Sequence, residues 1–193
     1  MDGAMGTAIQ ELRLDESDFR GERFKDATSD LKGNNELLTL TRPEVIQKIH
    51  LDYLLAGADI LETNTFTANT VSQADFGTED LVYELNYASV KLAQAAIAEL
   101  QVDQPDRICF VAGAIGPTTR SASLSPDVND PGFRNIDFKS LVADYGLAIQ
   151  ALDDAGADIL LIETIFDVLN AKAAIFAALS HFENTGRTLP IMI

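Results

Sequence analysis

Acidic side chains at the ends of two predicted strands are the first candidates for chemistry in this sequence. The phrase Ala56–Thr63 (Ala-Gly-Ala-Asp-Ile-Leu-Glu-Thr) returns in extended form as Ala155–Thr164. Each copy predicts a helix that ends at a glycine, followed by a short apolar strand that ends in a carboxylate, Glu62 or Glu163. Parallel α/β folds place their chemistry at the carboxyl ends of the strands, so both glutamates are candidate site residues.

Both glutamates also have an alternative role inside the protein. A carboxylate beside an apolar strand costs free energy unless it is paired or hydrated. Glu163 could form a salt bridge with a loop arginine, Arg120 or Arg134, and Glu62 could be paired internally. The sequence leaves both alternatives open.

Helical and strand patterns alternate along the chain. Thr41-Arg42-Pro43-Glu44 predicts a capping box at the start of the first of four helices, and Asp137 predicts the N-cap of the third. The predicted helices cover residues 43–56, 78 onward, 137–155 and 168–182, and the strands residues 59–63, 107–113, 158–163 and 189 onward. Strands that are apolar on both faces and separated by helices predict an α/β fold with a parallel sheet and outer helices.

Polar loops follow the carboxyl ends of two predicted strands. One contains Asn64 and Thr65, and the other, residues 114–136, is longer than most loops in compact domains. Because Phe133 and Arg134 can anchor the longer loop, we expect it to be ordered and to share a binding face with the first loop.

The composition argues against several classes of function. Lys+Arg number 14 against 30 Asp+Glu, and the resulting net charge of −16 argues against binding to nucleic acid or to an anionic membrane. No apolar run approaches the roughly 18 residues of a membrane span. The single cysteine, Cys109, is expected to be a core thiol in a cytoplasmic protein. His50 and His181 have no metal ligands at suitable spacing and are expected at the surface.

Segments spread along the chain resemble the homocysteine S-methyltransferase family. The resemblance is carried by Asp-Gly-Ala-Met-Gly-Thr at residues 2–7, by Glu-Thr-Asn-Thr-Phe at 62–66, and by residues 113–131, which contain Gly-Ala-Ile-Gly-Pro-Thr-Thr-Arg and Ser-Leu-Ser-Pro-Asp-Val-Asn-Asp-Pro. It continues through residues 133–135 and 162–164. The run at 113–131 is similar to the homocysteine-binding module of cobalamin-dependent methionine synthases and differs from betaine-dependent relatives.

The resemblance implies a TIM (β/α) barrel, which has eight parallel strands and typically about 250 residues. The predicted strands would be the second to fifth of the eight, so residues 1–193 would be a homocysteine-binding domain that is incomplete at both ends. In the family, cysteines on later strands hold homocysteine as a zinc thiolate. These cysteines are expected beyond Ile193, and no metal ligand is expected within this segment.

The reaction implied by the resemblance is methyl transfer to the sulfur of homocysteine, which gives methionine. The methyl group would come from methylcobalamin, recharged by methyltetrahydrofolate, on cobalamin- and folate-binding modules of the same polypeptide. Zinc would deprotonate a thiol that by itself is only a few per cent ionised at about pH 7. This segment alone is expected to hold neither zinc nor cobalamin and to be inactive, with no catalytic residue of its own.

The task implied for this chain is to hold the amino-acid end of homocysteine. Asp2 and Glu163 are expected to accept from the ammonium, and backbone N–H groups of Gly3, Ala4 and their neighbours to bind the carboxylate at a helix start. The pocket is expected to be lined further by Glu62, Asn64 and Thr65. The alternative for residues 2–5 is a plain glycine turn with a cap.

Other functions remain open from the sequence. One is a homocysteine methyltransferase that uses betaine or S-methylmethionine as the methyl donor. Another is a truncated, inactive barrel that binds a partner or only packs. The Ser-Pro-Asp-Val-Asn segment at residues 125–129 favours the cobalamin-dependent enzyme over the first alternative.

Overall fold

A single parallel sheet organises the chain, and the computed structural model describes all of residues 1–193. The sheet has four strands in the order β1-β2-β3-β4, so each strand lies beside the next one in sequence. The strands are β1 (Ile60–Glu62), β2 (Phe110–Ile115), β3 (Ile159–Ile162) and β4 (Ile191–Met192). Every neighbouring pair is parallel, which confirms the predicted α/β fold.

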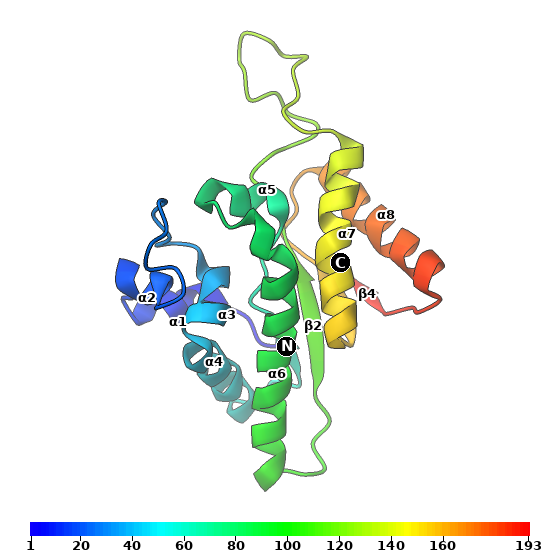
Figure 1. Ribbon diagram of the computed structural model, residues 1–193. Coiled ribbons are helices and arrows are strands. Elements are labelled where there is room, and N and C mark those ends of the chain that lie inside the picture. Colours follow the sequence, from blue (N-terminus) through cyan, green and yellow to red (C-terminus); the bar gives the residue numbers. More distant parts are fainter.

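Helices connect the strands and pack on the sheet. The long helices are α4 (Pro43–Leu55), α6 (Val82–Asp103), α7 (Phe138–Ala155) and α8 (Val168–Thr185). The short ones are α1 (Met5–Glu11), α2 (Glu16–Arg20), α3 (Leu38–Thr41) and α5 (Thr70–Gln73), with 3₁₀ turns at Asn35–Leu37, Ala74–Phe76 and Glu79–Leu81. Figure 1 shows α6 and α7 in front of β2, and α4 packs on α6 while α8 packs on α7. None of the helices combines the length and the apolar character needed to cross a membrane.

The beginning of β2 differs from the prediction. The strand begins at Phe110 rather than at Arg107 and continues to Ile115. The Arg107 guanidinium instead donates to the carbonyl oxygens of Leu54 and Ala58, at 2.7 and 2.8 Å. Arg107 therefore stabilises the turn between α4 and β1. Strand propensity cannot predict this contact, because it joins segments that are distant in sequence.

The helix starts confirm one predicted cap and correct another. Asp137 caps α7 by accepting from the backbone N–H of Ser140 at 2.7 Å. The capping box predicted over residues 41–44 is wrong, because Thr41 ends α3 and donates its hydroxyl to the carbonyl of Leu37. The local pattern predicts Thr41 as the N-cap of α4, but Thr41 is the last residue of the short helix α3, and Arg42 precedes α4 instead.

The hydrophobic core lies between the sheet and the long helices. Fully buried side chains from both layers meet there, among them Leu61, Val111, Leu160, Leu141, Ile149 and Leu152. A second apolar cluster joins the short N-terminal helices to α4 and includes Ile9, Phe19, Leu37, Leu38 and Ile46. This second cluster fixes the opening turn of the chain beside β1.

The long loop between β2 and α7 projects beyond the ends of the helices (Figure 1). Phe133 is 47% exposed and Val128 is 93% exposed, so the predicted anchoring of the loop by Phe133 is wrong. Arg134 donates to carbonyl oxygens of the loop itself, including Pro131 at 2.9 Å. The base of the loop is tied to α8, where the side chain of Asn170 donates to the carbonyl of Arg120 at 2.9 Å.

Both histidines lie in the interior or at its edge, which corrects their predicted surface positions. The side chain of His50 is fully buried, and its Nδ1 lies 3.6 Å from Oδ2 of Asp2. His181 pairs with Asp153 at 2.9 Å, and its side chain is 13% exposed. In each case a segment distant in sequence covers a helix face that appears polar when the helix is considered alone.

Candidate functional site

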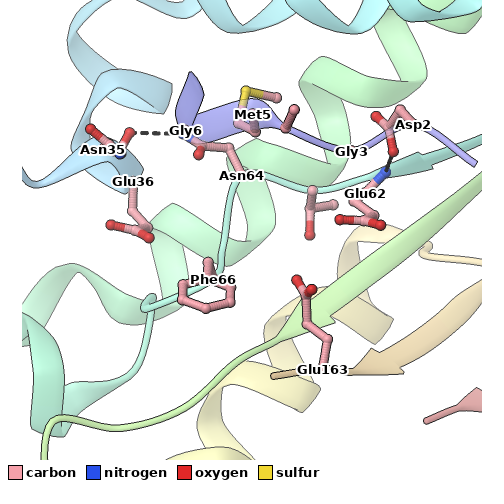
Figure 2. Close-up of a pocket in the computed structure, with 12 residues that line it drawn as sticks. Asp2, Gly3, Met5, Gly6, Asn35, Glu36, Glu62, Asn64, Phe66 and Glu163 are labelled. Atoms are coloured by element: carbon pink, nitrogen blue, oxygen red, sulfur yellow. Dashed lines mark hydrogen bonds between the residues drawn. The ribbon is translucent and has the colours of Figure 1, made fainter. Parts of the chain in front are cut away.

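A cavity of about 310 Å³ lies at the carboxyl ends of β1 and β3 (Figure 2). Glu62 is the last residue of β1, and Glu163 directly follows β3. A parallel sheet brings these strand ends to one edge, so the two glutamates of the repeated phrase meet. The lining consists of Asp2, Gly3, Ala4, Met5, Gly6, Asn35, Glu36, Glu62, Thr63, Asn64, Phe66 and Glu163.

Acidic side chains that line this cavity repel one another. The carboxylates of Glu62 and Glu163 face the same space from opposite sides (Figure 2). Burial raises the pKa of Glu62 to about 7, and repulsion from Glu163 and Asp2 contributes to the rise. Burial also raises the pKa of Glu163, against a hydrogen bond from Thr164 that lowers it. A cation between these carboxylates would relieve the repulsion.

Asp2 is held against β1 by its backbone and its side chain. Its N–H donates to the carbonyl of Ile60 at 2.9 Å, and its Oδ1 accepts from the N–H of Glu62 at 2.7 Å. The other carboxylate oxygen, Oδ2, faces His50, and the Asp2 side chain is only 3% exposed. The carboxylate therefore forms the back wall of the cavity in a fixed orientation.

The start of α1 forms another side of the cavity. Ala4 precedes the helix in a left-handed conformation, with φ of 47°, and no side chain caps the helix. The N–H groups in the first turn of a helix have no intrahelical acceptor. Since Gly3, Met5 and Gly6 also line the cavity, this turn presents uncapped backbone donors close to the acidic side chains.

The two polar residues predicted after the first strand have different positions. Asn64 lines the cavity and donates its side-chain amide to the carbonyl of Asn35 at 2.8 Å. Thr65 does not line the cavity. Its hydroxyl donates to the carbonyl of Ala114 at 2.7 Å and lies 2.6 Å from the hydroxyl of Thr63, so it ties β1 to β2.

Glu36 and Phe66 are cavity residues that were not among the predicted site residues. Glu36 is 5% exposed, its Oε1 accepts from the N–H of Thr67 at 2.9 Å, and burial raises its pKa. Its signal in the sequence is an acidic residue directly before Leu37-Leu38, the start of a largely apolar segment. Phe66 stands in the quoted 62–66 segment, but only the folded chain turns its ring to the cavity.

The proposed internal partners of the glutamates are absent. No arginine contributes to the environment of Glu163, and Arg134 is used by the carbonyls of its own loop. The charges of Glu163 and Asp2 raise the pKa of Glu62, and the chain's amino terminus lowers it. The Glu62 carboxylate forms no ion pair. The structure thus removes the salt-bridge alternatives and leaves both carboxylates for the cavity.

The side chains of this chain do not fit a metal ion. No group of three or more His, Cys, Asp or Glu residues is placed to hold one. Cys109 directly precedes β2, at the other end of that strand from the cavity. The predicted core position of this thiol is wrong, because Cys109 is only partly buried and packs against the edge of the core; this partial burial raises the pKa of the thiol.

The fold and the site together define a class of protein. Parallel strands with helices between them, and polar side chains converging at the carboxyl ends of the strands, are the arrangement of TIM-barrel enzymes. The chain belongs to the homocysteine S-methyltransferase family, whose sequence model matches residues 1–193.

Solved structures of the homocysteine methyltransferase MmuM from Escherichia coli are similar to this chain. The metallated form is 26% identical, with a TM-score of 0.71 over 97% of this chain and 59% of that chain. The oxidized form is 25% identical, with a TM-score of 0.70 over 97% of this chain and 58% of that one. The predicted partial TIM barrel is confirmed, and the chain spans about 59% of the MmuM length.

Proposed function

We propose that this chain binds the amino-acid end of homocysteine as part of a homocysteine S-methyltransferase. The observation that carries the proposal is the convergence of Glu62 and Glu163 on one cavity with no cationic side chain in its lining. The start of α1 adds backbone donors to the same cavity. Acceptors and donors on different walls match a zwitterion, which has one ammonium and one carboxylate.

The proposed roles follow from charge and position. Glu163 binds the ammonium directly, and Asp2 and Glu62 strengthen the negative field around it. The backbone N–H groups of Gly3, Ala4 and the first turn of α1 bind the carboxylate. Asn64 shapes the wall between them. A volume of about 310 Å³ corresponds to roughly ten waters at about 30 Å³ each, which is ample for a small amino acid.

The proposal assigns this chain to binding and leaves the methyl transfer to groups outside residues 1–193. Zinc, bound by cysteines beyond Ile193, would deprotonate the substrate thiol. We propose methylcobalamin as the donor, carried with a folate-binding module on the same polypeptide, because residues 113–131 resemble the cobalamin-dependent enzymes. An enzyme that uses betaine or S-methylmethionine is the second candidate. A cobalamin-binding module in the downstream coding DNA would support the first choice, and its absence the second.

Calorimetric titration of the 193-residue chain with homocysteine under reducing conditions tests the proposal. We expect Glu163→Gln to raise the dissociation constant about tenfold or more, since a charge-assisted contact is worth about 1.5–3 kcal/mol. Glu183→Gln, an exposed change on α8, is the matched control and should bind as the wild type does.

A second ligand separates the contribution of the ammonium group to binding from that of the rest of the substrate. The analogue 4-sulfanylbutanoate has the thiol and the carboxylate of homocysteine but lacks the amino group. It should bind weakly, and it should lose no affinity in Glu163→Gln, because it has no ammonium for Glu163 to bind. Equal affinity of both proteins for homocysteine would remove Glu163 from the site, and no binding of homocysteine to the wild type would reject the proposed function.

A further inference from the structure

His50, on α4, is a buried ionisable side chain that the proposed function does not use. Its side chain is fully buried, and neither ring nitrogen has a hydrogen-bond partner. Buried polar atoms without partners are rare in native proteins, because desolvation costs free energy that only a partner offsets. The position of His50 therefore requires a physical explanation.

The charged group beside His50 belongs to the cavity. Nδ1 lies 3.6 Å from Oδ2 of Asp2, a separation that permits an ionic contact but exceeds a normal hydrogen bond. The Asp2 side chain is 3% exposed, so little water separates the two groups. Its other oxygen already accepts from the backbone of Glu62. The two oxygens of one carboxylate thus have different neighbours, β1 on one side and an imidazole on the other.

The acidic lining of the cavity indicates that the His50 imidazole acts as a donor to Asp2. Asp2, Glu36, Glu62 and Glu163 all line the cavity, and no lysine, arginine or histidine does. Without a donor on the side of His50, Oδ2 of Asp2 would be buried among like charges and have no partner, which favours a swing of the carboxylate away from β1. A proton on Nδ1 of His50 offsets that repulsion from the side of Asp2 that faces away from the ligand.

We propose that Nδ1 of His50 carries a proton directed at Oδ2 of Asp2, and that His50 is thereby a positioning residue for the ammonium site. It keeps the Asp2 carboxylate fixed against β1, so that the negative field that Asp2 adds around the ammonium has a constant direction. The functional part of this inference rests on the proposed binding of homocysteine, whereas the pairing with Asp2 can be measured without any ligand.

Nitrogen-15 NMR of the histidine rings tests the pairing directly, because protonated and bare ring nitrogens have well-separated shifts. The sequence contains two histidines, so His181→Gln assigns the remaining signals to His50. We expect a protonated Nδ1 in the wild type at neutral pH. In Asp2→Ala the proton should leave Nδ1, because a free neutral imidazole favours the other nitrogen. A bare Nδ1 in the wild type, or an Nδ1 that is unchanged in Asp2→Ala, would overturn the proposal.

Ligand affinity separates positioning from a merely structural role. His50→Leu removes the donor, whereas the amide of His50→Asn can place an N–H near the position of Nδ1. We expect the dissociation constant for homocysteine to rise about tenfold in His50→Leu, the loss of one contact worth about 1.4 kcal/mol, and to recover in His50→Asn. The affinity for 4-sulfanylbutanoate, which lacks the ammonium, should not change.

The outcomes distinguish the two proposals. Equal losses for both ligands in His50→Leu would mean that His50 only supports the fold, and would overturn the positioning role. If His50→Leu does not fold, the NMR comparison of the wild type with Asp2→Ala still decides whether the pair exists. If the wild type does not bind homocysteine, the proposed function fails, while the NMR result for the pair stands on its own.

Discussion

Oδ1 of Asp2 accepts a hydrogen bond from the backbone N–H of Glu62 at 2.7 Å, and the N–H of Asp2 donates to the carbonyl of Ile60 at 2.9 Å. Residue 2 therefore occupies the place of a strand neighbour along β1. The opening turn and the end of β1 fix each other, so the position of the Asp2 carboxylate relative to β1 is set by hydrogen bonds to the backbone as well as by side-chain packing.

The free energy of unfolding should depend on pH through Glu62. Burial, with repulsion from Glu163 and Asp2, raises its folded pKa to about 7 from the ordinary value of 4.5. The folded state then binds the proton more tightly than the unfolded state, so stability falls as pH rises from about 4.5 to about 7 and is level above that range.

The variant Glu62→Gln should remove this pH dependence. Because Glu62 is half-buried and partly screened by solvent, we expect the variant to be about 1 kcal/mol more stable than the wild type at pH 8 and equal to it at pH 4.5. Urea unfolding at both pH values measures the difference, with Glu183→Gln as the exposed control. A stability gain that is the same at both pH values would show that folding does not raise the pKa of Glu62.

Gly116 should not tolerate a side chain. A Cβ at this position would lie 2.1 Å from the carbonyl oxygen of Phe66, a backbone atom that cannot move without displacing the cavity wall. We expect Gly116→Ala to lower the free energy of unfolding by about 2–3 kcal/mol and to weaken homocysteine binding.

The matched control for this change is Gly146→Ala. Gly146 lies within α7, and a Cβ there meets no atom within 4 Å. Alanine should stabilise that helix by about 0.5–1 kcal/mol. Thermal unfolding of both variants measures the contrast, and a Gly116→Ala protein as stable as the wild type would mean that the two loops can separate at no cost.

Asp167 should stabilise the junction between α8 and the long loop. Burial raises the pKa of its carboxyl, but hydrogen bonds from Ser121, Ser123 and Leu169 outweigh burial and hold the pKa below its usual range. The carboxylate caps α8 and also binds the base of the loop. Its stabilising contribution is present above the unfolded pKa of about 3.9 and is lost as pH falls through the folded value.

We therefore expect Asp167→Ala to cost about 2 kcal/mol of unfolding free energy at pH 7, the loss of a helix cap and a loop contact. Asp106→Ala, an exposed change in the turn before β2, should stay within about 0.5 kcal/mol of the wild type. Chemical unfolding of the two variants compares them. Equal stabilities would show that the loop base holds without Asp167.

The parts of the fold that depend on local chemistry were predictable. Gly57, Gly156 and Gly186 follow the helices α4, α7 and α8 with φ of 110°, 87° and 70°, left-handed values that a glycine adopts at little cost. Alternation of amphipathic and apolar runs indicated the parallel sheet. The repeated phrase placed Glu62 and Glu163 at strand ends, where the structure has them.

Other features were decided only when distant segments packed together. The hydrogen bond from Glu62 to Asp2, the burial of His50 behind it, and the entry of Glu36 into the cavity join residues that no short pattern relates. Periodicity and propensity act over a few residues and therefore determine elements, caps and strand ends. Which carboxylates share one cavity, and which imidazole lies behind them, depends on packing between the opening turn, α4 and β1, because burial and charge repulsion arise only in the folded chain.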